Sequence, residues 1–235
     1  MMYLKFDVNT KGKDYCVGDC HGEYDRLIFF LHKTGFNEKK DRLFCVGDLV
    51  NKGPNSDQVL DWLSQPWFYS VRGNHEQMII DTRDPYNSVA DDLLFKNGGG
   101  WYFMLSDKEK ERIYWEFSSL PFMIEVEMAN CATFGIIHAD VPFNDWDKAK
   151  KHLYENDQHS KNFMLWDRSR WAGDITGNVG GVDYVLVGHT PVSDVVQENN
   201  IIRLDTGAVF VNEYKKFEKG FTIMNMTDFE FISEM

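Results

Sequence analysis

The sequence lacks any long hydrophobic run. None of its 235 residues belongs to an uncharged apolar stretch of about 18 residues, so no transmembrane helix is predicted. Residues 1–15 mix lysine and aspartate with a few apolar side chains, which is not the pattern of a secretory signal. We therefore expect a cytoplasmic protein with no membrane partner.

Positive charge is scarce. Lys and Arg number 25 against 37 Asp and Glu, which gives a net charge of −12. Nucleic acids are bound by basic surfaces, so this balance argues against a nucleic-acid partner. A site for an anionic ligand would need a local source of positive charge, such as metal ions.

Cysteine is also rare, and linkers and internal repeats are absent. None of the four cysteines has Cys-x-x-Cys spacing, and Cys16 and Cys45 lie in apolar segments, so reduced core thiols are expected. Apolar residues make up 43% of the chain, enough for a substantial core. A single domain over residues 1–235 is the expected organisation.

Short apolar runs alternate with helical patterns, which predicts an α/β layered fold. Ser106 and Glu109 have capping-box spacing, which predicts a helix to Ser118. Residues 142–182 read as a polar excursion with helical pieces. The other expected helices are Glu23–Lys33 and Ser56–Ser64, and the expected strands are Asp14–Gly18, Arg42–Gly47, Trp67–Arg72, parts of Pro121–His138, Val185–Val187, Val192–Gln197, Ile201–Leu204 and Gly220–Met226.

Five short motifs stand where strands are expected to end. Ligands of α/β sheets gather at the carboxyl ends of strands, so the motifs are predicted to converge. Each motif alone is compatible with an ordinary turn, whereas all five together indicate a functional site. They are GDCHG (18–22), GDLVNKGP (47–54), RGNHE (72–76), IHAD (137–140) and GHTP (188–191).

The motifs supply six donors of mixed nitrogen and oxygen type: Asp19, His21, Asp48, Asn74, His138 and His189. A set without thiolates suits Mn, Fe, Zn or Ni better than calcium or structural zinc. Six donors exceed the needs of one four-coordinate ion, so two divalent metal ions sharing a carboxylate are expected. Two such ions outweigh two carboxylates and leave a positive site for a phosphate dianion.

The ordered motifs resemble the calcineurin-type metallophosphoesterases, and within them the phosphoprotein phosphatases of the bacteriophage lambda type. The similarity spans nearly the whole chain, through Val71–Ile80, Asn97–Trp101, His138–Phe143, Gly188–Pro191 and Asp205–Phe210. It implies an α/β fold of one domain, a calcineurin-like β-sandwich of two mixed sheets flanked by helices. It also implies a binuclear metal centre in which Mn²⁺ is the expected ion.

The resemblance implies a role for each motif residue. His75 would be the general acid, Arg72 a phosphate ligand, and Arg168 a second one, with Arg170 as an alternative to Arg168. One ion would be held by Asp19, His21 and Asp48, and the other by Asp48, Asn74, His138 and His189, with Asp48 as the bridge.

The chain departs from the family pattern Gly-Asp-x-x-Asp-Arg-Gly at Asn51 and Lys52. Asn51 can orient the ring of His75 but cannot stabilise its charged form as an aspartate would. Lys52 keeps a positive charge for substrate binding but lacks the two-pronged geometry of arginine. We therefore expect a weakened general acid and a preference for esters whose leaving groups need little protonation, such as aryl phosphates.

The predicted function is hydrolysis of phosphomonoesters by direct attack of a metal-bridging hydroxide. The expected partner is a protein carrying phosphoserine or phosphothreonine, and also phosphotyrosine, or a small phosphate ester. Two alternatives remain open. One is a hydrolase of dinucleoside polyphosphates or other diesters with the same metals, and the other is a metal-binding interaction protein in which catalysis has weakened.

Two remaining features carry less weight. Asp205-Thr206-Gly207 matches a motif of aspartic proteases, but those enzymes need two copies and the chain has one. Asp140 follows a predicted ligand histidine and is expected either beside the ligands or in a solvated turn.

Overall fold

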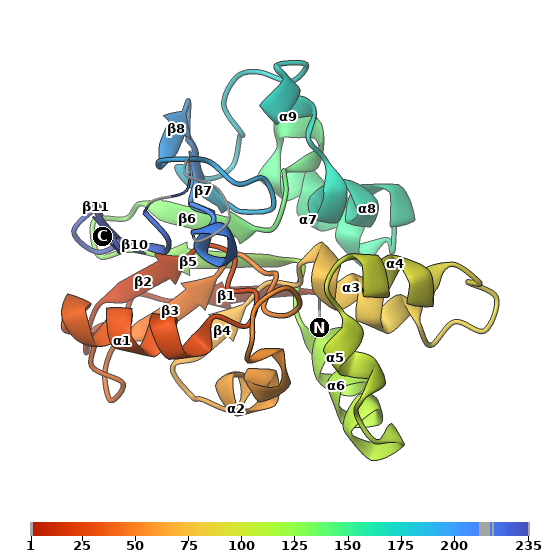
Figure 1. The fold of residues 1–235 in the computed structure, drawn as a ribbon. Helices are drawn as coiled ribbons and strands as arrows, with labels where there is room; N and C mark the ends of the chain where they lie inside the picture. Colours follow the sequence, from red (N-terminus) through yellow and green to blue (C-terminus); the bar gives the residue numbers. More distant parts are fainter. Residues whose placement is uncertain (1, 212–216, 218, 235) are drawn as a thin grey trace.

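The computed structural model describes residues 2–211, 217 and 219–234. Two mixed β-sheets face each other, and helices cover their outer faces (Figure 1). The predicted sandwich of two mixed sheets flanked by helices is confirmed.

One sheet is built largely from the first eighty residues and has the strand order β11-β10-β2-β3-β4. Strands β2, β3 and β4 are parallel, while β10 runs antiparallel to both β2 and β11. Helices α1 (Tyr24–Thr34) and α2 (Val59–Leu63, preceded by a 3-10 turn at Ser56–Gln58) connect the parallel strands, as predicted. The strands are β2 Asp14–Val17, β3 Arg42–Cys45, β4 Phe68–Ser70, β10 Thr222–Asn225 and β11 Glu230–Ser233.

The other sheet has the order β1-β5-β6-β7-β9-β8. The prediction of a strand over Val192–Gln197 is wrong for its first part, because the chain bends before Val196 and the Asp194 carboxylate accepts a hydrogen bond from the backbone N–H of Val195. The strands are β1 Tyr3–Phe6, β5 Met123–Glu127, β6 Thr133–Ile137, β7 Tyr184–Val187, β8 Val196–Glu198 and β9 Ile201–Arg203.

Alternation along the strands divides the core into layers. In β2, Cys16 faces the opposite sheet, while Tyr15 and Val17 pack on the other side with Leu27 of α1. The second sheet buries its outer face against α7 (Trp146–Tyr154) and α8 (Gln158–Trp166). Each large apolar side chain that is buried contributes about 1.5–3 kcal/mol to the stability of the fold. The three layers of such side chains therefore hold the two sheets and their helices together.

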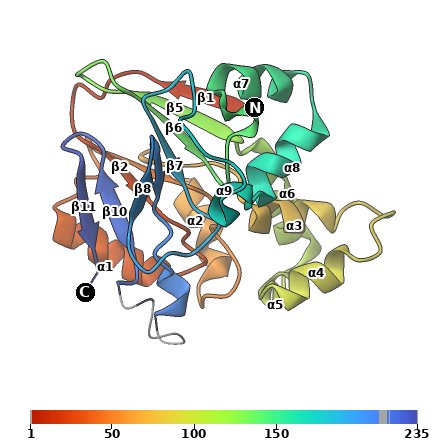
Figure 2. The same ribbon diagram turned by 90° about the horizontal axis from the view of Figure 1, so that it is seen from above.

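The helices between residues 74 and 119 connect the two halves of the sequence and lie beside the sandwich (Figures 1 and 2). The Ser106 capping box is confirmed: its hydroxyl accepts from the N–H of Glu109, whose carboxylate accepts from the N–H of Ser106. The excursion 142–182 contains helical pieces, as predicted. These elements are α3 Asn74–Asp81, α4 Ala90–Lys96, α5 Gly100–Phe103, α6 Asp107–Ser119, α9 Ser169–Ala172 and short 3-10 turns at Pro142–Asn144 and Ala208–Phe210.

All four cysteines are free thiols. Cys16 and Cys45 are fully buried, as expected for core thiols, and Cys131 is exposed. Among the described residues, no helix has the length and apolar character needed to cross a bilayer.

Candidate metal centre

The motif loops meet at the carboxyl ends of strands from both sheets. The first sheet contributes the loops after β2, β3 and β4, and the second contributes those after β6 and β7. All six predicted ligands are buried, namely Asp19, His21, Asp48, Asn74, His138 and His189.

Several of the converging loops hold strained backbone. Five predicted site residues adopt positive φ angles between 45° and 72°, a region that non-glycine residues enter at a cost of about 1–3 kcal/mol. Such strain persists only where the surrounding structure enforces it, and it gathers at functional sites. The five are His21, Asp48, Asn51, Lys52 and His189.

Two histidines have their ring hydrogens fixed by backbone carbonyls. The Nδ1 of His138 lies 2.8 Å from the carbonyl oxygen of Val46, and the Nδ1 of His21 lies 2.9 Å from that of Val50. A carbonyl only accepts, so Nδ1 carries the hydrogen in both rings. Each Nε2 is therefore left with a lone pair directed into the site, as a metal ligand requires.

Acceptor atoms converge on one another in the site. The Nε2 of His138 lies 2.8 Å from Asn74 Oδ1 and 3.3 Å from Asp48 Oδ1. The Nε2 of His21 has the ammonium of Lys52 at 3.0 Å. Lone pairs that face each other at such distances need a cation between them, and the lysine already places one positive charge there. The donor set fits divalent metal ions.

Asp48 is shared by two groups of side chains. In each group the ligand atoms all lie within 4.8 Å of one another: His21, Asp48 and His75 in one, and Asp48, His138 and His189 in the other. This is the arrangement expected of a carboxylate between two ions. Asp19 belongs to neither group, and its carboxylate accepts a hydrogen bond from the backbone N–H of His189 at 3.1 Å.

Burial controls the charges of the site. It raises the pKa of Asp48 to about 7 and lowers the pKa of His138 to about 4 and that of His189 to about 2. The imidazoles are therefore neutral ligands at physiological pH. The Asp48 carboxylate requires a neighbouring cation to stay fully ionised.

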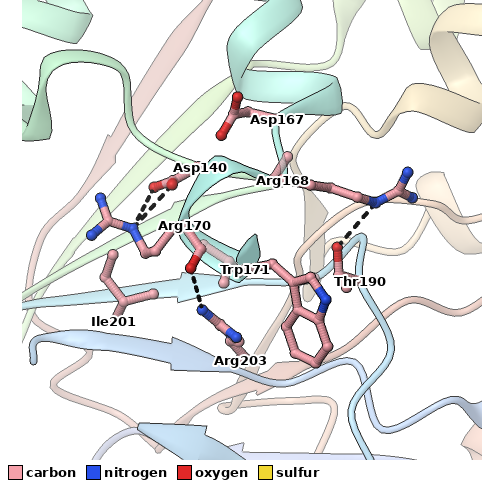
Figure 3. Close-up of a pocket in the computed structure, with 11 residues that line it drawn as sticks. Asp140, Asp167, Arg168, Arg170, Trp171, Thr190, Ile201 and Arg203 are labelled. Carbon is pink, nitrogen blue, oxygen red and sulfur yellow. Dashed lines mark hydrogen bonds and ion pairs between the residues drawn. The ribbon is translucent and has the colours of Figure 1, made fainter. Parts of the chain in front are cut away.

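The two candidate arginines point in opposite directions from the start of α9 (Figure 3). Arg170 is buried and paired with Asp140, its Nε lying 3.0 Å from Oδ2. Arg168 donates from Nε to Thr190 Oγ1 at 3.3 Å and makes no ion pair with a described carboxylate. Arg168 is thus available to an anionic ligand, whereas Arg170 is used inside the fold. Asp140 is buried, so the solvated turn expected as one of its two settings is wrong.

Arg72 is engaged away from the predicted ligands. Its guanidinium donates to the carbonyl oxygens of Ser118 and Leu120 and to Gln77 Oε1, and it stacks over Phe122 at 4.6 Å. The structure thus gives the predicted phosphate-binding role of Arg72 no direct contact in its favour.

Sequence reasoning missed Glu76 and Trp101. The Glu76 carboxylate accepts from the backbone N–H groups of Asp48, Leu49 and Gly73 at 2.8–3.0 Å and ties two motif loops together. Its position at the first turn of α3 was the available signal, since an acidic residue there readily caps backbone N–H groups. The indole Nε1 of Trp101 donates to Asn51 Oδ1 at 2.8 Å, a contact that no sequence pattern indicates.

Two groups of histidine and aspartate side chains that share Asp48, at the ends of strands from two mixed sheets, are a site of the kind found in metallophosphoesterases. The chain belongs to the calcineurin-like phosphoesterase family, which it matches over residues 15–193. It is 33% identical over 212 residues to Serine/threonine-protein phosphatase 2 of Escherichia coli (strain K12), covering 88% of this chain and 92% of that one.

The chain is also similar to a second kind of phosphatase in sequence and to a third in structure. Bis(5'-nucleosyl)-tetraphosphatase PrpE [asymmetrical] of Oceanobacillus iheyensis is 27% identical over 234 residues, covering 87% of this chain and 89% of that protein. The solved structure of a cold-active protein-tyrosine phosphatase from a psychrophilic Shewanella has a TM-score of 0.61 at 18% identity, covering 98% and 82% of the two chains. This second likeness supports the fold alone.

Proposed function

We propose that this chain is a metal-dependent phosphatase that hydrolyses phosphomonoesters on proteins, at phosphoserine and phosphothreonine and also at phosphotyrosine. The observation that carries the proposal is the convergence of acceptors around Asp48, which belongs to both candidate ligand groups. The Escherichia coli relative, named a serine/threonine-protein phosphatase, supports the substrate class.

The ligand residues would hold two divalent ions, of which Mn²⁺ is our choice. One ion would lie with Asp19, His21 and Asp48, and the other with Asp48, Asn74, His138 and His189. When bound, such ions lower the pKa of coordinated water and neutralise phosphate charge. The carbonyls of Val46 and Val50 orient two of the imidazoles for this purpose.

Substrate binding falls to side chains around the ligand groups. Arg168 would bind phosphate oxygens, because its guanidinium has no carboxylate partner among the described residues. Lys52 would add a positive charge beside His21. His75 would face the leaving-group oxygen, with its ring held through Nδ1 by Asn51.

Hydrolysis of dinucleoside polyphosphates is the second candidate function. The relative from Oceanobacillus iheyensis, which carries a tetraphosphatase name, covers most of this chain. The half-exposed ring of Trp171, with the Arg203 guanidinium over it at 4.9 Å, lies in the same pocket as Arg168 and offers a surface for stacking a base (Figure 3).

The test is hydrolysis of p-nitrophenyl phosphate by metal-stripped protein with and without added Mn²⁺. Phosphoserine, phosphothreonine and phosphotyrosine peptides and diadenosine tetraphosphate complete the panel, and His75→Asn is the control. We expect Mn²⁺-dependent turnover of the monoesters that falls in the control. Turnover of diadenosine tetraphosphate alone would favour the second function. Bound metal with no turnover of any ester would leave a metal-binding interaction protein.

A further inference from the structure

A chain of hydrogen bonds links Trp101 to His75 through a single buried amide. The indole Nε1 of Trp101 lies 2.8 Å from Asn51 Oδ1, and Asn51 Nδ2 lies 2.9 Å from His75 Nδ1. Asn51 is fully buried, and its backbone N–H is bound by the hydroxyl of Ser56 at 2.9 Å. The amide therefore has two side-chain partners and little freedom to find others.

The indole decides which way the amide faces. An indole N–H only donates, so the amide atom next to Trp101 must be the oxygen. The NH₂ group of Asn51 then faces His75 and donates to Nδ1. This orientation follows from the chemistry of the two partners alone.

A Gly-rich segment brings the indole to this place. A side chain at Gly98, whose φ is +84°, would put its Cβ 2.6 Å from the backbone nitrogen of Lys52. Glycine thus permits the connection between α4 and α5 to lie against the Asn51-Lys52 turn, where the Lys52 N–H approaches the Gly98 carbonyl at 3.4 Å. Trp101 follows three residues later, in the first turn of α5.

We propose that Trp101 is a positioning residue: its indole N–H locks the Asn51 amide so that His75 accepts at Nδ1 and carries its hydrogen on Nε2. This Nε2 lies 3.8 Å from Asp48 Oδ2, on the side of the ligand groups. His75 is thereby distinguished from His21 and His138, whose Nε2 atoms keep lone pairs. A ring with hydrogen on Nε2 is a hydrogen-bond donor to substrate and a poor metal ligand.

The fixed tautomer of His75 determines which phosphate esters are hydrolysed fastest, a consequence that rests on the proposed function. A neutral ring can donate a hydrogen bond from Nε2, but transferring that proton would leave an imidazolate. When water adds its hydroxyl to phosphorus, the ester oxygen must therefore leave with the electron pair of the broken P–O bond and take its proton from solvent. Phenolate-type leaving groups tolerate this better than alkoxides do, so aryl phosphates such as phosphotyrosine should be hydrolysed faster than phosphoserine or phosphothreonine.

The tautomer can be measured on the metal-free protein by long-range ¹H–¹⁵N correlation spectra, with His75→Gln assigning the ring signals. In the wild type we expect an unprotonated-type shift at Nδ1 and a protonated-type shift at Nε2. Trp101→Phe should free the amide to turn and move hydrogen to Nδ1. Trp115→Phe, which changes an exposed indole on α6, is the matched control and should change nothing.

The same variants are then compared in turnover. Once the amide oxygen faces Nδ1, it can accept from a charged ring, which can then pass its Nε2 proton to the leaving oxygen. Trp101→Phe should therefore lower the kcat/KM ratio of aryl to alkyl phosphate severalfold, and Trp115→Phe should leave it unchanged. A wild-type spectrum with hydrogen on Nδ1, or an unchanged tautomer in Trp101→Phe, would overturn the proposal. If Trp101→Phe does not fold, Asn51→Asp keeps an acceptor for the indole and must move the hydrogen to Nδ1. Absence of turnover in every protein would defeat the proposed function while leaving the tautomer measurement intact.

Discussion

At the scale of single residues, two arginines separated by one residue have different tasks. Arg170 neutralises Asp140 inside the fold, and Arg168 turns toward Thr190 with no carboxylate partner among the described residues (Figure 3). The sequence left the choice between them open because they lie only two positions apart in the chain. Only the direction of each side chain separates a structural cation from one that can bind substrate.

We expect Arg168→Ala to raise KM for p-nitrophenyl phosphate about tenfold or more, since one charge-assisted hydrogen bond is worth about 1.5–3 kcal/mol. Its melting temperature should stay near that of the wild type. Arg170→Ala should instead cost about 3–5 kcal/mol of stability by leaving Asp140 unpaired. Steady-state kinetics and thermal melts of both variants test this, with exposed Arg112→Ala as the control. Equal effects of the two on KM would contradict the assignment.

Asn51→Asp should restore a carboxylate that can stabilise a charged His75. A working general acid contributes about 10²–10⁴-fold, so kcat/KM for a phosphoserine peptide should rise about tenfold or more. Hydrolysis of p-nitrophenyl phosphate should change far less, because its leaving group needs little protonation. Asn130→Asp makes the same charge change at an exposed turn and serves as the control. Equal gains on both esters would rule the explanation out.

At the scale of elements, the start of α3 is where two motif loops are joined. Glu76 accepts from backbone N–H groups on both sides of the joint, and a side chain at Gly73 would put its Cβ 2.2 Å from Asp48 Oδ1. The glycine leaves room for the Asp48 carboxylate, and the glutamate holds the two loops together.

Glu76→Gln should therefore weaken both the fold and the metal site. A glutamine offers one acceptor and a donor where Glu76 offers two acceptors, which leaves a buried N–H unsatisfied at a cost of about 1–3 kcal/mol. We expect a lower denaturation midpoint and weaker Mn²⁺ binding in calorimetry. Glu116→Gln on the exposed side of α6 is the comparison, and a Glu76 variant with wild-type Mn²⁺ affinity would show that the joint does not position the ligands.

Elements were predictable from the sequence where their signals are local. Apolar runs gave most strands, and the Ser106 box gave the start of α6. Strand β1 was missed because Tyr3–Phe6 is defined by pairing with Met123–Val126, more than a hundred residues away. The contact of Trp101 with Asn51 was unpredictable for the same reason, and the stacking of the two sheets came only from the family resemblance.

At the scale of the whole molecule, the charge state of the metal centre couples to folding. In the metal-free protein, the raised pKa of Asp48, about 7, stabilises the fold at low pH, and this contribution is lost as pH rises from about 4 to 7. The lowered pKa of His138, about 4, acts in the opposite direction: its contribution is present above about 6.5 and is lost as pH falls toward 4. The two largely offset each other.

Bound metal ions would change this pH dependence of stability, because they require an ionised Asp48 and neutral imidazoles. The free energy of unfolding gained from Mn²⁺ should therefore increase from pH 5 to pH 7, by about 1.4 kcal/mol per pH unit for each proton displaced, and level off above pH 7. The gain in melting temperature should follow the same course. Thermal melts with Mn²⁺ and with EDTA across this range measure it. A gain independent of pH would show that Asp48 is already ionised without metal.

The division of donors between the two sheets has a consequence for synthesis of the chain. Asp19, Asp48 and Asn74 leave the ribosome soon after strands β2, β3 and β4, whereas His138 and His189 follow much later, after β6 and β7. A nascent chain can therefore carry its carboxylates for most of translation without being able to close the second ligand group. A product truncated before His138 therefore lacks two of the predicted donors and cannot form the group of Asp48, His138 and His189.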